Sequence, residues 1–287
     1  MVRTILSLLL SVAVLPSWAH AEVLFEGYAK VLSGDQHIGY IISRYEFDEK
    51  KKLFSATYFL KTNAAGSDIT ESLKALADSE LAPISYEYTS VVGKDTKTID
   101  AKFKNGTMTA LVKASGKPVD HLEKKIPKGT FLSTFLVYLI LKSKDGLKAD
   151  TKYDYQAIAE EDGAIEKGTA SVEKEEVHNG IKAFKISNTF KDSKFLSYVT
   201  AHGEVLGTDA VAQGVSTQLV ATAAEAEGTV PVSQGLLKTI FGTIPTGQGN
   251  VVATSKPVAT ASPVPAATTT PVKAPAASTG KPDAQGK

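Results

Sequence analysis

The sequence predicts a mostly β protein, in which a curved antiparallel sheet or unclosed barrel surrounds one buried apolar helix and a disordered tail follows. Three observations support this fold class. Apolar and polar residues alternate over many short segments, turn-forming residues separate those segments, and one segment is apolar on nearly every side. A period of two is typical of strands with one buried face, and turn signals that recur this often favour antiparallel pairing.

The first two strands are predicted at residues 23–32 and 37–47, separated by the turn-forming residues 33–36. Asn105-Gly106 and Asn179-Gly180 indicate two tight hairpins, because this dipeptide tolerates positive φ angles. Segment 68–77 fits either a helix or a strand, and its neighbours favour a strand. The remaining strands are predicted at residues 53–62, 84–92, 98–104, 107–113, 152–159, 170–177, 181–190, 195–200 and 218–223.

Residues 130–141 depart from the alternation and predict a helix. The segment begins with a threonine of the capping type and runs into Lys142 and Lys144, which suit a helix C-terminus. Because it is apolar on nearly every face, it must be buried, and about a dozen residues are too few to span a bilayer. The helix either fills the concave side of the sheet or lines a cavity for an apolar guest. The residues expected at that cavity are Phe131, Leu132, Phe135 and Leu139.

The first 21 residues have the three parts of a secretory signal peptide. Arg3 precedes an apolar stretch, Pro16 ends it, and Ala19-His20-Ala21 forms a small-x-small cleavage site. Cleavage is favoured over an uncleaved anchor, since the apolar run is too short for a membrane span. The chain contains no cysteine, so we expect neither a lipid anchor nor a disulfide. The predicted location is the periplasm, with secretion beyond the outer membrane as the alternative and no transmembrane segment after cleavage.

Composition divides the rest of the chain into a β-rich domain (residues 22–228), a linker (229–245) and a tail (246–287). The tail holds half of the twelve prolines and no aromatic residue, leucine or isoleucine. It cannot bury enough apolar surface to offset its ordering entropy, so it is expected to be disordered. It acts either as a spacer or as a weakly basic tether to the cell wall or outer-membrane surface.

The linker contains a short apolar island at residues 235–242. Leu236, Leu237, Ile240 and Phe241 recur at about helical spacing, which predicts a short amphipathic helix. This helix either docks back on the domain or presents these four residues to a partner protein.

No set of residues has the spacing of a catalytic or metal site. Ser171 and Lys174 match a serine-x-x-lysine pattern, but the strand-like alternation places them on opposite faces. The histidines of the mature chain are isolated, and the carboxylate clusters at 160–163 and 173–176 indicate solvated charge in turns. With 32 basic and 31 acidic residues, the chain has no global field to hold nucleic acid. We therefore predict a non-enzymatic protein without metal or cofactor; a hydrolase site assembled from distant residues is a third hypothesis.

Several stretches resemble a family of uncharacterised periplasmic β-rich proteins, and the likeness covers roughly residues 22–227. The stretches are Gly39-Tyr40, residues 78–88 with Leu81, Pro83 and Tyr86, residues 100–103, and Ser197-Tyr198 through residues 203–206. The hairpins, the single apolar helix and the signal peptide together also resemble periplasmic half-barrel domains of the lipoprotein-carrier type. That resemblance implies a lipid-holding cavity inside an unclosed sheet capped by helices. It brings no catalytic residue to this chain.

Two functions follow as the leading hypotheses. The first is a non-catalytic envelope protein that binds a lipid, a lipoprotein-like molecule or another amphipathic ligand in the concavity of the sheet. The alternative is a structural or protein-protein interaction module of the envelope, which uses its sheet edges and its tail.

Overall fold

The computed structural model describes residues 21–64, 67–230 and 233–255, which belong to one compact unit ending at Ser255. The predicted signal peptide and residues 256–287 of the predicted tail lie outside the described residues, Ala21 excepted. Within the described part of the chain, no helix is both long and apolar enough to cross a membrane.

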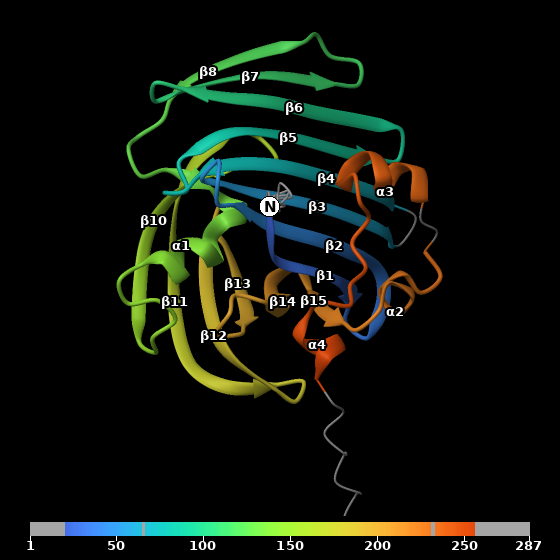
Figure 1. Ribbon diagram of the computed structural model, residues 1–287. Coiled ribbons are helices and arrows are strands. Elements are labelled where there is room, and N and C mark those ends of the chain that lie inside the picture. The colour runs from blue at the N-terminus through green and yellow to red at the C-terminus, as the bar shows by residue number, and fades with distance from the viewer. Residues whose placement is uncertain (1–20, 65–66, 231–232, 256–287) are drawn as a thin grey trace, which may run out of the picture. The chain divides into compact units, whose positions relative to one another are not determined.

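All strands of the described residues join one 15-stranded sheet, in the order β8-β7-β6-β5-β4-β3-β2-β1-β15-β14-β13-β12-β11-β10-β9 (Figure 1). Neighbouring strands are antiparallel except β9, which runs parallel to β10. The strands are β1 (Glu22–Ser33), β2 (Gln36–Asp48), β3 (Leu53–Ala64), β4 (Ser67–Asp78), β5 (Pro83–Val92), β6 (Asp95–Lys104), β7 (Thr107–Ala114), β8 (Asp120–Lys125), β9 (Phe131–Leu132), β10 (Thr151–Ala159), β11 (Ala164–His178), β12 (Ile181–Phe190), β13 (Ser193–Val199), β14 (Val205–Ala210) and β15 (Val215–Val220). The predicted fold class, a mostly β protein built on an unclosed antiparallel sheet, is confirmed.

The helices found in the described residues are few and short. They are α1 (Leu136–Lys142), α2 (Ala223–Glu227), α3 (Gln234–Phe241) and α4 (Val251–Thr254), with 3-10 turns η1 (Ser133–Phe135) and η2 (Val211–Gln213). Each predicted strand is present, and the ambiguous segment 68–77 forms β4. Asn105 and Asn179 both have φ near 51° and precede glycines with positive φ, so the two tight hairpins are confirmed.

The helix predicted for residues 130–141 is only partly correct, because its first half joins the edge of the sheet. Phe131 and Leu132 pair with Ala157 and Ile158 as β9, and α1 begins only at Leu136. Thr130 does not cap the helix; its hydroxyl donates to the side-chain oxygen of Gln156 at 3.4 Å. Tertiary pairing thus overrides the local helical preference.

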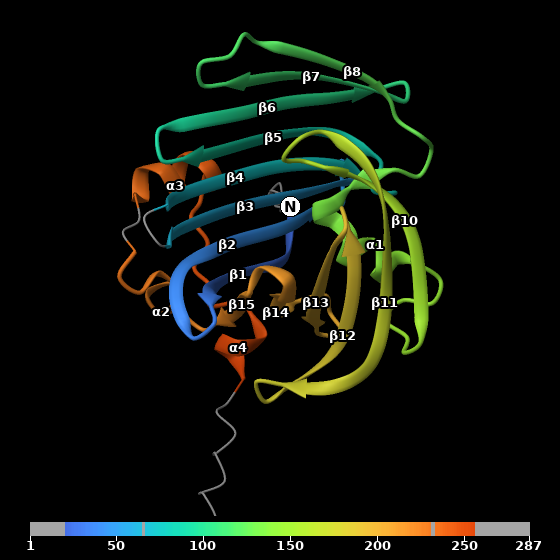
Figure 2. The same cartoon turned by 180° about the vertical axis from the view of Figure 1, so that it is seen from behind.

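The sheet coils so that its β9 edge returns to the inner face of β4. Both views place α1 on the inner side of this coil (Figures 1 and 2). Ile140 of α1 packs against β11–β13, whereas the Tyr138 ring lies 5.3 Å from that of Tyr45 and 5.8 Å from that of Phe54, counted between centroids. The helix therefore joins the two arms of the coil and fills the space between them.

Small side chains allow this close return of the edge. A cross-strand row on the inner face runs through Ala56, Ala75, Tyr86, Ala101 and Ala110, and its four alanines are at most 5% exposed. We call these four residues the alanine row. Phe131, Leu132 and Phe135 belong to the same core cluster, and none is more than 2% exposed.

The outer face of the first strands is covered by the C-terminal segment, residues 223–230 and 233–255. Leu237 of α3 is fully buried in a cluster that includes Tyr28, Tyr40, Ile42 and Phe59. Of the two alternatives for the apolar island, the structure shows the docked helix. Ile240 and Phe241 pack partly buried against the same cluster, while Leu236 remains exposed.

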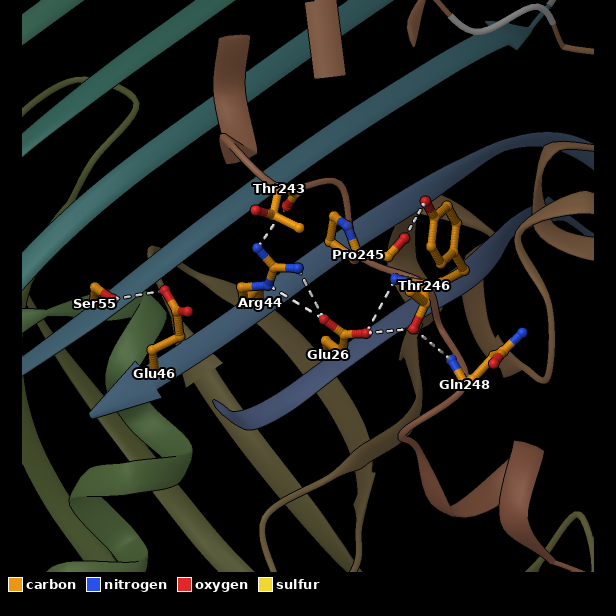
Figure 3. Close-up of polar contacts among 9 residues, drawn as sticks. Glu26, Arg44, Glu46, Ser55, Thr243, Pro245, Thr246 and Gln248 are labelled. Carbon is orange, nitrogen blue, oxygen red and sulfur yellow. Dashed lines mark hydrogen bonds and ion pairs between the residues drawn. The ribbon is translucent and has the colours of Figure 1, made fainter. Parts of the chain in front are cut away.

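A polar network fixes the segment that follows α3 (Figure 3). Arg44 pairs with Glu26 at 3.0 Å and donates to the backbone oxygen of Thr243 at 2.7 Å. Glu26 accepts from both the backbone N–H and the hydroxyl of Thr246, each at 3.0 Å. The buried Asn250 then donates to the backbone oxygens of Val220 and Gly247. These contacts keep residues 246–255 with the domain, and the compact unit ends at Ser255.

Two adjacent leucines of α3 test the docking. Replacing the fully buried Leu237 with serine leaves a cavity and a polar hydroxyl in the outer-face cluster, and we expect a loss of about 3 kcal/mol in the free energy of unfolding. Leu236 is 41% exposed, so Leu236→Ser is expected to change it by less than about 0.5 kcal/mol. Urea denaturation of both variants measures the difference. Equal midpoints for the two variants would contradict a docked α3.

Candidate functional site

A cleft of about 370 Å³ lies where the sheet coils back on itself. We call it the seam cleft. It is lined by Ser43, Tyr45, Tyr58, Glu71, Leu73, Tyr88, Ser133, Thr134, Glu160 and Glu161. These residues come from β2–β5 on one side and from η1 and the turn after β10 on the other, so only the folded coil brings them together.

The first wall follows from strand register. Ser43, Tyr58, Leu73 and Tyr88 lie directly opposite one another on β2, β3, β4 and β5. Because side chains alternate along a strand, residues two positions away share the same face, which brings Tyr45 and Glu71 into the cleft. The result is a tyrosine-rich wall with one carboxylate at its margin.

The second wall is built around Glu160, which is only 5% exposed. The Ser133 hydroxyl donates to one carboxylate oxygen at 2.5 Å, and the Thr134 backbone N–H donates to the other at 3.1 Å. The Tyr45 hydroxyl reaches across from β2 and donates to the Thr134 backbone oxygen at 3.3 Å. Hydrogen bonds therefore link the two walls along one side of the cleft.

The electrostatics of the cleft differ from those of a solvated surface. Burial raises the pKa of Glu160 to about 7, although the hydrogen bonds from Ser133 and Thr134 act in the opposite direction. Burial, together with the nearby charge of Glu71, also raises the pKa of Tyr58 well above its usual range. Glu71 accepts from the Tyr58 hydroxyl at 2.9 Å and from Ser90 at 3.4 Å.

Lysines hold the turn that carries Glu160. Lys191 Nζ lies 2.6 Å from carboxylate oxygens of both Glu161 and Asp162. Lys97 of β6 donates to the Glu161 backbone oxygen at 2.7 Å, and Lys124 of β8 donates to that of Gly163 at 2.9 Å. The turn is thereby fixed against the inner face of the strands beyond β4, and this fixation holds Glu160 in its buried position.

The residues predicted to line an apolar cavity lie mostly in the core. Phe131, Leu132 and Phe135 are almost completely buried, in the core cluster that also contains the alanine row. Leu139 is partly buried and lines a different, open cleft of about 730 Å³ beside β10. Of the four residues predicted for partner binding, Leu237 is inaccessible, Ile240 and Phe241 are partly covered, and Leu236 alone is exposed.

Neither Glu160 nor the tyrosines stand out in the sequence as a site. Glu160 begins a run of carboxylates in a turn, a pattern that normally indicates solvent exposure. Tyr58 and Tyr88 follow the ordinary alternation of their strands, and nothing local marks their face as a cleft. In the part of the chain that the structure describes, no group of three or more histidine, cysteine or acidic residues is arranged to hold a metal ion.

Comparisons with known proteins concern the fold alone. No family model matches the chain, and no curated protein matches it. Among solved structures, a beta-barrel-like protein of domain of unknown function DUF1849 from Brucella abortus is similar, with 14% identity and a TM-score of 0.44. The match covers 69% of this chain and 97% of that chain.

The raised pKa of Glu160 predicts a pH-dependent stability. Below about pH 4.5 the carboxyl is protonated in both the folded and the unfolded chain, so its titration does not change the free energy of unfolding. Between about pH 4.5 and about pH 7 the unfolded chain releases the proton while the folded chain keeps it. The stability present at low pH is therefore lost as pH rises, by on the order of 3 kcal/mol for a shift of this size.

Glu160→Gln isolates this contribution, because glutamine keeps the shape and an acceptor oxygen but does not titrate. We compare the free energy of unfolding of the variant with that of the natural chain. We expect the difference, variant minus natural chain, to be larger at pH 8 than at pH 4.5 by that same amount. Urea unfolding of both proteins from pH 4 to 8 measures the difference at each pH. A difference that stays constant across this range would disprove the buried, proton-retaining carboxyl.

Proposed function

We propose that this chain is an exported, non-catalytic binding protein that holds a small amphipathic molecule in the seam cleft. The observation that supports it is the joining of a wall of tyrosines and Leu73 to two oriented carboxylates, Glu71 and Glu160, in one cleft. An apolar wall provides affinity and a few fixed polar groups provide orientation, which is how small-molecule sites are generally built.

The size of the cleft limits the ligand. About 370 Å³ lies near the lower end of the roughly 300–1,000 Å³ of small-molecule pockets. The resemblance to lipoprotein carriers implies a cavity that holds a lipid. The seam cleft would hold a smaller part of such a ligand than that resemblance implies. Because Phe131, Leu132 and Phe135 fill the concavity beside α1, a lipid would place its polar part in the seam cleft and leave its chains outside. The periplasm as its location rests on the predicted signal peptide.

A bulky residue in the wall tests the binding site. Ser43 is a small residue of the tyrosine-rich wall, so Ser43→Trp is expected to fill the cleft. Thr109→Trp, at an exposed position of β7, is the control. For protein purified without detergent, we expect the native mass to exceed the denatured mass by a bound molecule in the natural chain and in the control, and not in Ser43→Trp. Identical native and denatured masses in all three would contradict the proposal.

A second candidate function is a protein interaction module that uses the edge of β10. β9 pairs only with Ala157 and Ile158, and in the residues that the structure describes no strand pairs with the outer side of positions 151–156. This free edge lies beside the open cleft near Leu139, which Asp154, Tyr155 and Gln156 help to line. An extended peptide running parallel to β10 would continue the ladder that β9 begins.

Site-specific cross-linking distinguishes this second candidate. A photo-reactive amino acid at Asp154 is expected to yield a discrete cross-linked product with one envelope protein. The same group at Glu123, on the opposite edge strand β8, is the control and should give none. The product should persist in Ser43→Trp, because the seam cleft is a separate site. Indistinguishable products from both positions would argue against a specific edge.

A further inference from the structure

The seam cleft carries negative charge without a counter-ion of its own. Glu71, Glu160 and Glu161 line it, and none of the ten lining residues that the structure describes is basic. Lys191 binds Glu161, which accounts for one of the three carboxylates. For Glu71 and Glu160, by contrast, the structure shows no lysine, arginine or histidine within ion-pair distance among the described residues.

Neutral donors orient these two carboxylates but do not neutralise them. Glu160 accepts from the Ser133 hydroxyl and the Thr134 N–H, and Glu71 accepts from the hydroxyls of Tyr58 and Ser90. An ionised carboxylate has about four acceptor positions, so each keeps free capacity after these bonds. Desolvating a charge without an opposite charge is unfavourable, and the raised pKa of Glu160 expresses that penalty. A cation that enters the cleft relieves it.

The remaining wall selects the kind of cation. Tyr45, Tyr58 and Tyr88 come from three strands and share the cleft with Leu73. Aromatic rings attract cations through their electron-rich faces, and cages of such rings are typical of sites for methylated ammonium groups. A methylated ammonium has no strongly held water shell, so an aromatic wall suits it better than it suits a small metal ion.

We propose that the seam cleft binds a methylated ammonium group, with its positive charge near Glu71 and Glu160 and its methyl groups against the tyrosines and Leu73. This inference rests on the proposed function, since it names the ligand class of the same cleft. The group is chemically the same whether it belongs to a free amine such as choline or to the head of a phosphocholine lipid.

Two probes of equal shape test the charge. Choline and its neutral carbon analogue 3,3-dimethylbutan-1-ol are titrated calorimetrically into the full chain at pH 8, where Glu160 is largely ionised. We expect choline to bind more tightly by about tenfold or more, since one desolvated ion pair and one cation–π contact together supply a difference of that order. Equal affinities would overturn the ammonium proposal and leave the amphipathic binding function intact. Binding of neither probe, together with identical native and denatured masses, would overturn both.

Three glutamine variants locate the charge. Glu71→Gln and Glu160→Gln should each weaken choline binding by about tenfold and leave the neutral analogue unaffected. Glu87→Gln is the matched control: Glu87 lies on β5 between Tyr86 and Tyr88, and strand alternation places its exposed side chain on the opposite face. Choline affinity that is unchanged in both cleft variants would overturn the proposal. Unfolding curves show that each variant is folded before titration.

A soluble lipid separates the two sources of the group. Dihexanoylphosphatidylcholine carries the same trimethylammonium on a phosphodiester and two short chains. If it binds more tightly than choline and Ser43→Trp abolishes its binding, a lipid headgroup is the natural source. If choline binds more tightly, the cleft favours a free cation. Both results support the ammonium site, whereas lipid binding that survives in Ser43→Trp contradicts it.

Discussion

The alanine row determines how closely the β9 edge approaches the rest of the sheet. Only short alanine side chains project from this part of β3, β4, β6 and β7. They leave room on the inner face for Phe131, Leu132 and Phe135, each of which is almost completely buried there. β9 contacts β4, the strand that carries Ala75, and close-packed interiors tolerate little added volume at such a position. The seam cleft exists because the coil closes here and because the next row along carries tyrosines instead of alanines.

Coiling also explains why the C-terminal segment is part of the domain. The strands β1–β3 lie at the centre of the sheet, and their outer faces carry Tyr28, Tyr40, Ile42 and Phe59, which are too apolar to be left in water. In many antiparallel sheets one face is solvated, but here α3 and the following residues cover the second face. The Glu26–Arg44 pair and its bonds to Thr243 and Thr246 give this cover a fixed register that apolar contacts alone lack.

Local sequence patterns were sufficient for most of the strands and insufficient for the site. Period-two alternation and the Asn-Gly turns identify most of the sheet because they report on the neighbouring backbone. The polar β8, with Leu122 as its one apolar residue, and the two-residue β9 give no such signal. Residues 130–141 look helical by composition, yet pairing with Ala157 and Ile158 takes the first of them into the sheet. The burial of Glu160 depends on Ser133, 27 residues away, and on Lys97 and Lys124, which hold its turn.

The position of Glu160 connects the fold to the proposed binding. A carboxylate in this turn would be solvated if the sheet were flat, and its charge would then carry little penalty. The coil buries it against β2–β5, where only neutral donors reach it, so the folded state holds a carboxyl whose ionised form is unfavourable. An entering cation stabilises that ionised form, and the free energy lost by burying the carboxylate during folding is partly recovered on binding. The same closure that positions the tyrosines therefore also makes the cleft selective for positive charge.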